Sequence, residues 1–91
     1  MNLYTKNGRP LQVSGNTIYS RSGAPIGRIK GDRVFGTNGA YVGTIVNDRL
    51  VYRSTHSAGI GGSFSVAHRA GIARANRAGS AMWGDEPNIP D

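Results

Sequence analysis

Hydrophobic residues recur with a period of about sixteen over the first sixty positions. An aliphatic residue followed by an aromatic one opens each of four segments, at spacings of 15, 16 and 17: Leu3-Tyr4, Ile18-Tyr19, Val34-Phe35 and Val51-Tyr52. A second aliphatic position follows in each segment: Leu11, Ile26, Val42 and Ile60. β-Branched and aromatic residues dominate these segments, which indicates strands, and the period is too short for a helical repeat.

Two turn signals punctuate each period. The first is Asn7-Gly8, Ser22-Gly23 or Asn38-Gly39, and the second is Gly15-Asn16, Gly31-Asp32 or Asn47-Asp48. Two turn signals in about sixteen residues leave room for two strands of about five residues each, which is one β-hairpin per unit. Single hairpins are unstable, and a closed ring of hairpins removes exposed edges. We therefore expect an all-β, pseudo-fourfold, up-and-down barrel, closed or shallow, with about eight antiparallel strands in units 3–17, 18–33, 34–50 and 51–64, the last degenerate.

The second and third units each contain one extra residue. The aliphatic pairs Ile26 with Ile29 and Val42 with Ile45 stand three positions apart, so a regular strand would turn them to opposite faces. A glycine lies inside each pair, which is typical of a β-bulge. A bulge would return both aliphatic residues to one face. The alternative is that the second aliphatic residue faces outward.

The stretches from Tyr19 to Phe35 and from Phe35 to Tyr52, with weaker copies on either side, resemble the repeat of the four-fold β-flower family. The resemblance covers roughly residues 3–64. It implies a small barrel of repeated hairpins, and it implies no established activity.

From residue 64 the hydrophobic period changes. Small and apolar residues fall on one side of a helical projection: Phe64, Ala67, Gly71, Ala75, Ala78 and Met82. Arg69, Arg74 and Arg77 cluster on the other side, as candidate helix contacts. We expect an amphipathic C-terminal α-helix over 65–82 that caps the barrel or binds a protein partner or a second copy of the chain.

Residues 83–91 contain two prolines and three acids, which predicts an extended acidic tail with Trp83 as its anchor. The tail either lies loosely over the basic body or occupies a basic groove until a partner displaces it.

The charge is uneven. Residues 1–82 hold eleven Lys and Arg against two Asp, and the tail brings the formal net charge from +9 to +6. A basic body attracts polyanions, acidic proteins or anionic headgroups, although the charge also serves solubility. The chain has no cysteine, no apolar N-terminal run and no apolar stretch of membrane-spanning length. These features predict a cytoplasmic protein without disulfides, signal peptide or transmembrane segment.

Candidates for catalysis are sparse. Asp32 and Asp48 hold matching places and could form an acid–base pair, but each precedes an arginine and suits a turn better. His56 and His68 have no neighbouring ligands for a metal. The stretch AGIGGS at 58–63 matches no phosphate-binding fingerprint and is interpreted as a flexible linker between the barrel and the expected helix. We therefore expect no enzyme activity and no cofactor.

The four opening aromatic residues are the best candidate for a functional surface. If their aliphatic neighbours line the barrel, the rings lie outside, interleaved with arginines. The candidate binding surface comprises Tyr4, Tyr19, Phe35, Tyr52, Arg28, Arg33, Arg49 and Arg53. Alternatively the rings belong to the core or lie under the C-terminal segment.

The sequence therefore predicts a non-enzymatic binding or assembly module. The first alternative is a nucleic-acid or anionic-lipid binding domain, in which bases or headgroups meet the arginine-rich aromatic face. The second is a hydrolase that uses the paired aspartates.

Overall fold

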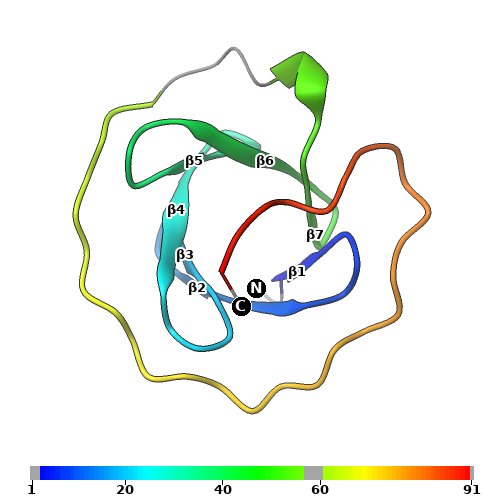
Figure 1. Ribbon diagram of the computed structural model, residues 1–91, viewed down its shortest axis with the longest axis horizontal. Coiled ribbons are helices and arrows are strands. Elements are labelled where there is room, and N and C mark those ends of the chain that lie inside the picture. Colours follow the sequence, from blue (N-terminus) through cyan, green and yellow to red (C-terminus); the bar gives the residue numbers. More distant parts are fainter. Residues whose placement is uncertain (1–2, 57–60, 91) are drawn as a thin grey trace.

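Seven short strands close into a barrel in the computed structural model, which describes residues 3–56 and 61–90 (Figure 1). The strands are β1 Leu3–Thr5, β2 Pro10–Ser14, β3 Thr17–Tyr19, β4 Pro25–Lys30, β5 Arg33–Gly36, β6 Tyr41–Val46 and β7 Arg49–Val51. A 3-10 helix, η1, follows at Ser54–His56. The strand order around the barrel is the order in the chain.

The predicted bulges in β4 and β6 are confirmed. Ile18 pairs with Gly27 and Tyr19 with Pro25, so the register passes over Ile26. The equivalent shift between β5 and β6 passes over Val42. Both aliphatic residues of each pair pack on the core cluster, as the bulge requires.

The barrel closes through a parallel pair, β1 with β7, and not through an eighth antiparallel strand. The expectation of about eight antiparallel strands is therefore wrong for the described residues. Directions alternate along an up-and-down sheet, so the first and seventh strands must run the same way. The amide of Tyr4 donates to the carbonyl oxygen of Asp48 at 2.9 Å to close the ring. The expected fourth aliphatic position, Ile60, lies outside the described residues.

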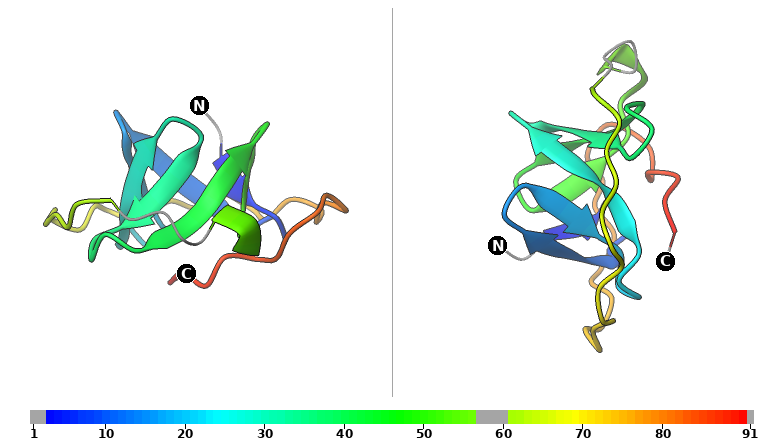
Figure 2. Two further views of the ribbon diagram at one scale, coloured as in Figure 1. Left: turned by 90° about the horizontal axis from the view of Figure 1, so that it is seen from above. Right: turned by 90° about the vertical axis from the view of Figure 1, so that its left-hand side faces the viewer.

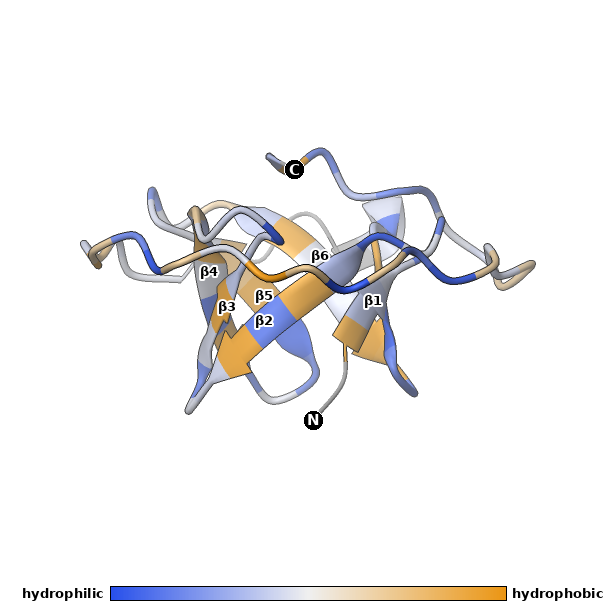
Figure 3. Ribbon diagram, turned by 90° about the horizontal axis from the view of Figure 1, so that it is seen from below, coloured by the Kyte–Doolittle hydropathy of each residue, from blue (hydrophilic) through white to orange (hydrophobic). Residues whose placement is uncertain are grey.

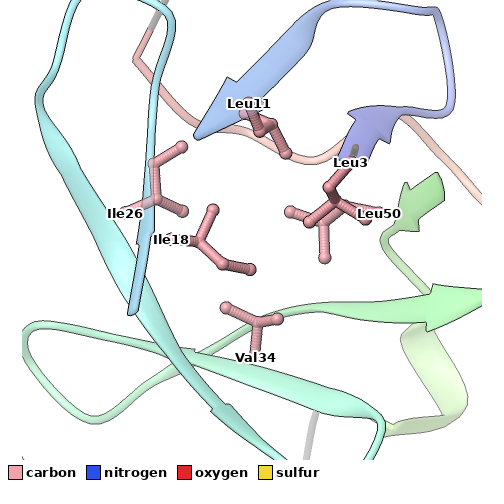
Figure 4. Packing of buried hydrophobic residues seen from close by; sticks show 6 residues of the cluster. All are labelled: Leu3, Leu11, Ile18, Ile26, Val34 and Leu50. Carbon is pink, nitrogen blue, oxygen red and sulfur yellow. The ribbon is translucent and has the colours of Figure 1, made fainter. Parts of the chain in front are cut away.

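The core lies on the barrel axis. Six buried aliphatic side chains point toward one another there: Leu3, Leu11, Ile18, Ile26, Val34 and Leu50 (Figure 4). They come from β1, β2, β3, β4, β5 and β7, so almost every strand contributes to one small cluster. In Figure 3 the hydrophobic bands lie mainly on these strands.

The α-helix predicted over residues 65–82 is wrong, because the described part of the chain contains no α-helix. Residues 61–85, here called the strap, run in an extended path around the outside of the barrel (Figures 1 and 2). A helix would touch one side of the barrel, whereas the strap contacts every hairpin. No helix in residues 3–56 or 61–90 is long and apolar enough to span a membrane.

The tail after the strap crosses the mouth of the barrel (Figure 1). Pro87 is fully buried and Ile89 packs on the core cluster. Arg9 holds this segment, since its guanidinium donates to Glu86 at 2.7 Å and to the carbonyl oxygens of Pro87 and Ile89. Trp83, the expected anchor, is 58% exposed.

Candidate binding surface

Three of the aromatic residues that open the hairpins, Tyr4, Tyr19 and Phe35, lie outside the barrel. Their aliphatic neighbours Leu3, Ile18 and Val34 are fully buried in the core cluster. In the fourth unit the core residue is Leu50, and Val51 is buried against Gly84 of the strap. Alternation along a strand then turns the rings outward. Tyr4, Tyr19 and Phe35 are nevertheless only 7–8% exposed, and Tyr52 is half-buried. Another part of the chain therefore covers them.

The strap is that cover. The guanidinium of Arg77 lies 4.7 Å from the ring centre of Tyr4, and that of Arg69 lies 5.1 Å from the ring centre of Tyr19. The guanidinium of Arg74 also lies near this ring, 5.9 Å from the ring centre of Tyr4. Such cation–π contacts are worth about 0.5–2 kcal/mol each, depending on desolvation. The arginines expected on a helix thus stack on the aromatic residues expected as an open surface.

Strap and barrel share a register. Three strap amides, eight residues apart, each donate a 2.8 Å hydrogen bond to a turn glycine: Gly61 to Gly39, Arg69 to Gly23 and Arg77 to Gly8. Three more, again eight apart, bond two positions earlier in each turn: Phe64 to Thr37, Ile72 to Arg21 and Ser80 to Lys6. The strap therefore passes the third, second and first hairpins in turn.

The size of the barrel explains why the contacts of the strap repeat every eight residues. A quarter of a circle 32 Å across measures about 25 Å, and eight extended residues span about 26 Å. The last quarter ends where Asp85 and Tyr52 exchange two backbone hydrogen bonds of 2.8 Å. Eight residues of the strap thus span one hairpin of the barrel.

The sequence matches the family described as 4-fold beta flower protein over residues 1–84. The chain belongs to this family. The match confirms the resemblance found in the hairpin repeats and extends it through nearly the whole strap. No curated protein and no solved structure matches this beta flower protein significantly.

The arginines of the candidate surface have different surroundings in this beta flower. Arg49 is buried and donates to the carbonyl oxygens of Thr5 and Lys6, both at 3.3 Å. Arg53 lies 4.9 Å from the ring centre of Trp83. These two arginines hold the closing strand and the strap in place. Their charges are engaged within the chain.

Arg28, Lys30 and Arg33 form a basic face on β4 and β5. Arg28 and Lys30 are exposed, Arg33 is half-buried, and Lys30 pairs with Arg33 across the two strands. None of the three forms an ion pair with a carboxylate in the part of the chain that the structure describes. Lys30 alternates with Arg28 along β4, so the two side chains lie on the same side of the strand.

Asp48 and Glu86 form ion pairs, whereas Asp32 and Asp85 form none in the described residues. Asp48 pairs with Arg49 at 3.7 Å and with Arg77 of the strap. A hydrogen bond from Arg77 to its carboxylate lowers the pKa of Asp48 below its ordinary value, and the charges of Arg77 and Arg49 act in the same direction. Within residues 3–56 and 61–90 no three His, Cys, Asp or Glu side chains gather as metal ligands. His56 lies in η1 and His68 in the strap.

Proposed function

We propose that this beta flower is a non-enzymatic binding or assembly module whose basic face, Arg28, Lys30 and Arg33, docks an acidic protein partner. The observation that carries the proposal is the pairing of Lys30 with Arg33 directly across β4 and β5. Like charges at such a position destabilise a sheet by about 0.2–1 kcal/mol. No described carboxylate forms an ion pair with Lys30 or Arg33. An anionic partner that binds both cations would offset this cost.

Burial of the aromatic rings favours a protein partner over a single-stranded nucleic acid. Stacking of bases requires exposed aromatic faces, and Tyr4, Tyr19 and Phe35 are at most 8% exposed beneath the strap. Nucleic-acid or anionic-lipid binding remains the second candidate, carried by charge alone. Such binding would weaken steeply with salt and show little preference for sequence.

The test is binding of labelled poly-glutamate, single-stranded DNA and single-stranded RNA by fluorescence anisotropy, and of phosphatidylserine vesicles by sedimentation, in a series of salt concentrations. We expect poly-glutamate to bind, and Lys30→Gln to weaken it several-fold more than Lys6→Gln. The two variants remove the same charge, but Lys6 lies in the first hairpin turn, away from the basic face. Tighter binding of nucleic acid or vesicles would favour the second candidate. Equal effects of the two variants, or no binding of any polyanion at low salt, would refute the basic face.

A further inference from the structure

A cavity of about 260 Å³ opens beside the basic face, between β4, the β2–β3 turn and the start of the strap. Arg28 and Lys30 line it from β4, and Gly62, Ser63 and Phe64 line it from the strap. Apolar surface comes from Ile29, Phe35 and Phe64. The volume is slightly below the range of about 300–1,000 Å³ for pockets that hold drug-sized ligands. It suits a compact compound with a single ring.

The polar groups around this cavity are suited to an anion. Its two charged lining residues are both cations, and no carboxylate lines it. The guanidinium of Arg28 lies 4.2 Å from the ring centre of Phe64, and this contact orients it at the cavity. Gly62 and Ser63 make no hydrogen bond in the described part of the chain, so their backbone amides are available as donors. Cationic side chains together with backbone amides form a common type of anion site.

The repeat of the strap explains why the cavity exists. At two hairpins the strap places an arginine over the aromatic ring, Arg77 over Tyr4 and Arg69 over Tyr19. Eight residues before Arg69 the strap has Gly61, whose backbone packs against the Phe35 ring. With glycine at 61 and 62, no strap side chain stacks on that ring in the described residues. The first two repeats therefore carry an arginine over the ring, and the third has a cavity beside a Phe35 ring that the strap backbone covers.

We propose that this cavity binds a small organic anion, a flat ring carrying a phosphate or carboxylate. The ring would lie among Ile29, Phe35 and Phe64, and the anionic group would meet Arg28, Lys30 and the amides of Gly62 and Ser63. This inference rests on the proposed function only in that both use Arg28 and Lys30. Arg33 belongs to the basic face but does not line the cavity, so the two proposals separate at that residue.

The probe is phenyl phosphate, titrated into the whole ¹⁵N-labelled protein and followed by amide chemical shifts. We expect saturable binding with a Kd on the order of millimolar, with the largest shifts at Lys30, Gly62 and Ser63. Inorganic phosphate tests the charge alone and phenol tests the ring alone, and each should bind at least fivefold more weakly. Benzoate distinguishes a carboxylate from a phosphate as the preferred anionic group.

Matched variants locate the site. Lys30→Gln should weaken phenyl phosphate about tenfold, the size of effect expected from losing a charged hydrogen bond. Arg33→Gln removes the same charge from the facing strand and should change the Kd less than twofold. Both variants keep the barrel core, which unchanged amide spectra would verify. Equal weakening by the two variants, phenol binding as tightly as phenyl phosphate, or no saturation would overturn the inference. If the parent protein binds poly-glutamate but not phenyl phosphate, the cavity proposal fails and the proposed function of the basic face is unaffected.

Discussion

The amide of Arg69 donates a 2.8 Å hydrogen bond to the carbonyl oxygen of Gly23, and the carbonyl oxygen of Arg69 occupies the place where a Cβ atom on Gly23 would lie. Gly8 with Arg77 and Gly39 with Gly61 repeat this relationship. Each of these three turn glycines therefore adopts a positive φ and also leaves room for the backbone of the strap.

Gly23→Ala should lower the free energy of unfolding by about 2–5 kcal/mol, the sum of a left-handed backbone at about 1–2 kcal/mol and overpacking against the strap at about 1–3 kcal/mol. Gly15→Ala and Gly31→Ala are the controls. Both glycines have a positive φ, +60° and +66°, but nothing lies within 4 Å of the added Cβ. They should cost only the backbone part. Urea unfolding measures all three, and equal losses would show that the strap does not hold the turns.

The hairpin barrel was predictable because its signals are local. Asn7-Gly8 and Gly31-Asp32 mark turns by their own backbone preferences, and glycine inside an aliphatic pair marks a bulge. The closing pair was not predictable, because whether β1 meets β7 or an eighth strand depends on distant contacts.

The strap was mistaken for a helix because its composition favours one. Alanine and arginine have high helix propensity, and small residues at spacings of three and four imitate an apolar stripe. The informative signal was the octad RAGIARAN at 69–76 followed by RAGSAMWG at 77–84. Its period is half that of the hairpins, and backbone hydrogen bonds to the barrel override the local preference. The covered state of the aromatic rings could not be inferred without knowing this path.

Asn47 occupies the position that Gly15 and Gly31 hold in the second turn of the preceding hairpin units. Its φ is +57°, close to the values at the equivalent Gly15 and Gly31. Asn47→Ala should lower the free energy of unfolding by about 1 kcal/mol, because alanine tolerates this conformation less well than asparagine. Asn47→Gly should be neutral or slightly stabilising. Asn16→Ala is the control, since Asn16 does not have a positive φ. Thermal unfolding compares the three, and an equal loss for both alanine variants would contradict the argument.

The Asp48–Arg77 ion pair should make stability depend on acid pH. Since Arg77 lowers the pKa of Asp48 in the folded state, the pair stabilises the fold above the ordinary carboxyl pKa of about 3.9. This contribution is lost as pH falls through the lowered folded value. Urea midpoints from pH 7 to pH 2 should therefore show Asp48→Asn below the parent protein near neutrality and converging with it in acid.

The side chains of Asp48 and Arg77 are nearly half exposed, 44% and 45%, so the stability difference between Asp48→Asn and the parent protein should be small. It should shrink further in 1 M salt, where the Debye length is about 3 Å. Asp32→Asn is the control, because Asp32 holds the same place in the preceding turn and makes no ion pair in the described residues. A gap for Asp48→Asn that stays constant from pH 7 to pH 2 would exclude the linkage.

Arg9 should determine whether the tail stays in the barrel mouth. Its side chain is 24% exposed, and its guanidinium donates to Glu86 and to the carbonyl oxygens of Pro87 and Ile89. Arg9→Ala removes these bonds and should lower the free energy of unfolding by about 1–3 kcal/mol. It should also accelerate amide exchange at residues 86–89 while leaving β3, β4 and β5 protected.

The matched control is Lys6→Ala, which removes the same charge from the same turn and no side-chain hydrogen bond to the tail. Ile89→Ala supplies an independent test, because it removes apolar contact with the core cluster without touching the arginine. If Arg9 acts by holding the tail in place, Arg9→Ala and Ile89→Ala should open the same amides, and the double variant should cost less than the sum of the two single ones. Additive costs would show that Arg9 and Ile89 act independently, and exchange that accelerates equally in Lys6→Ala would contradict this role of Arg9.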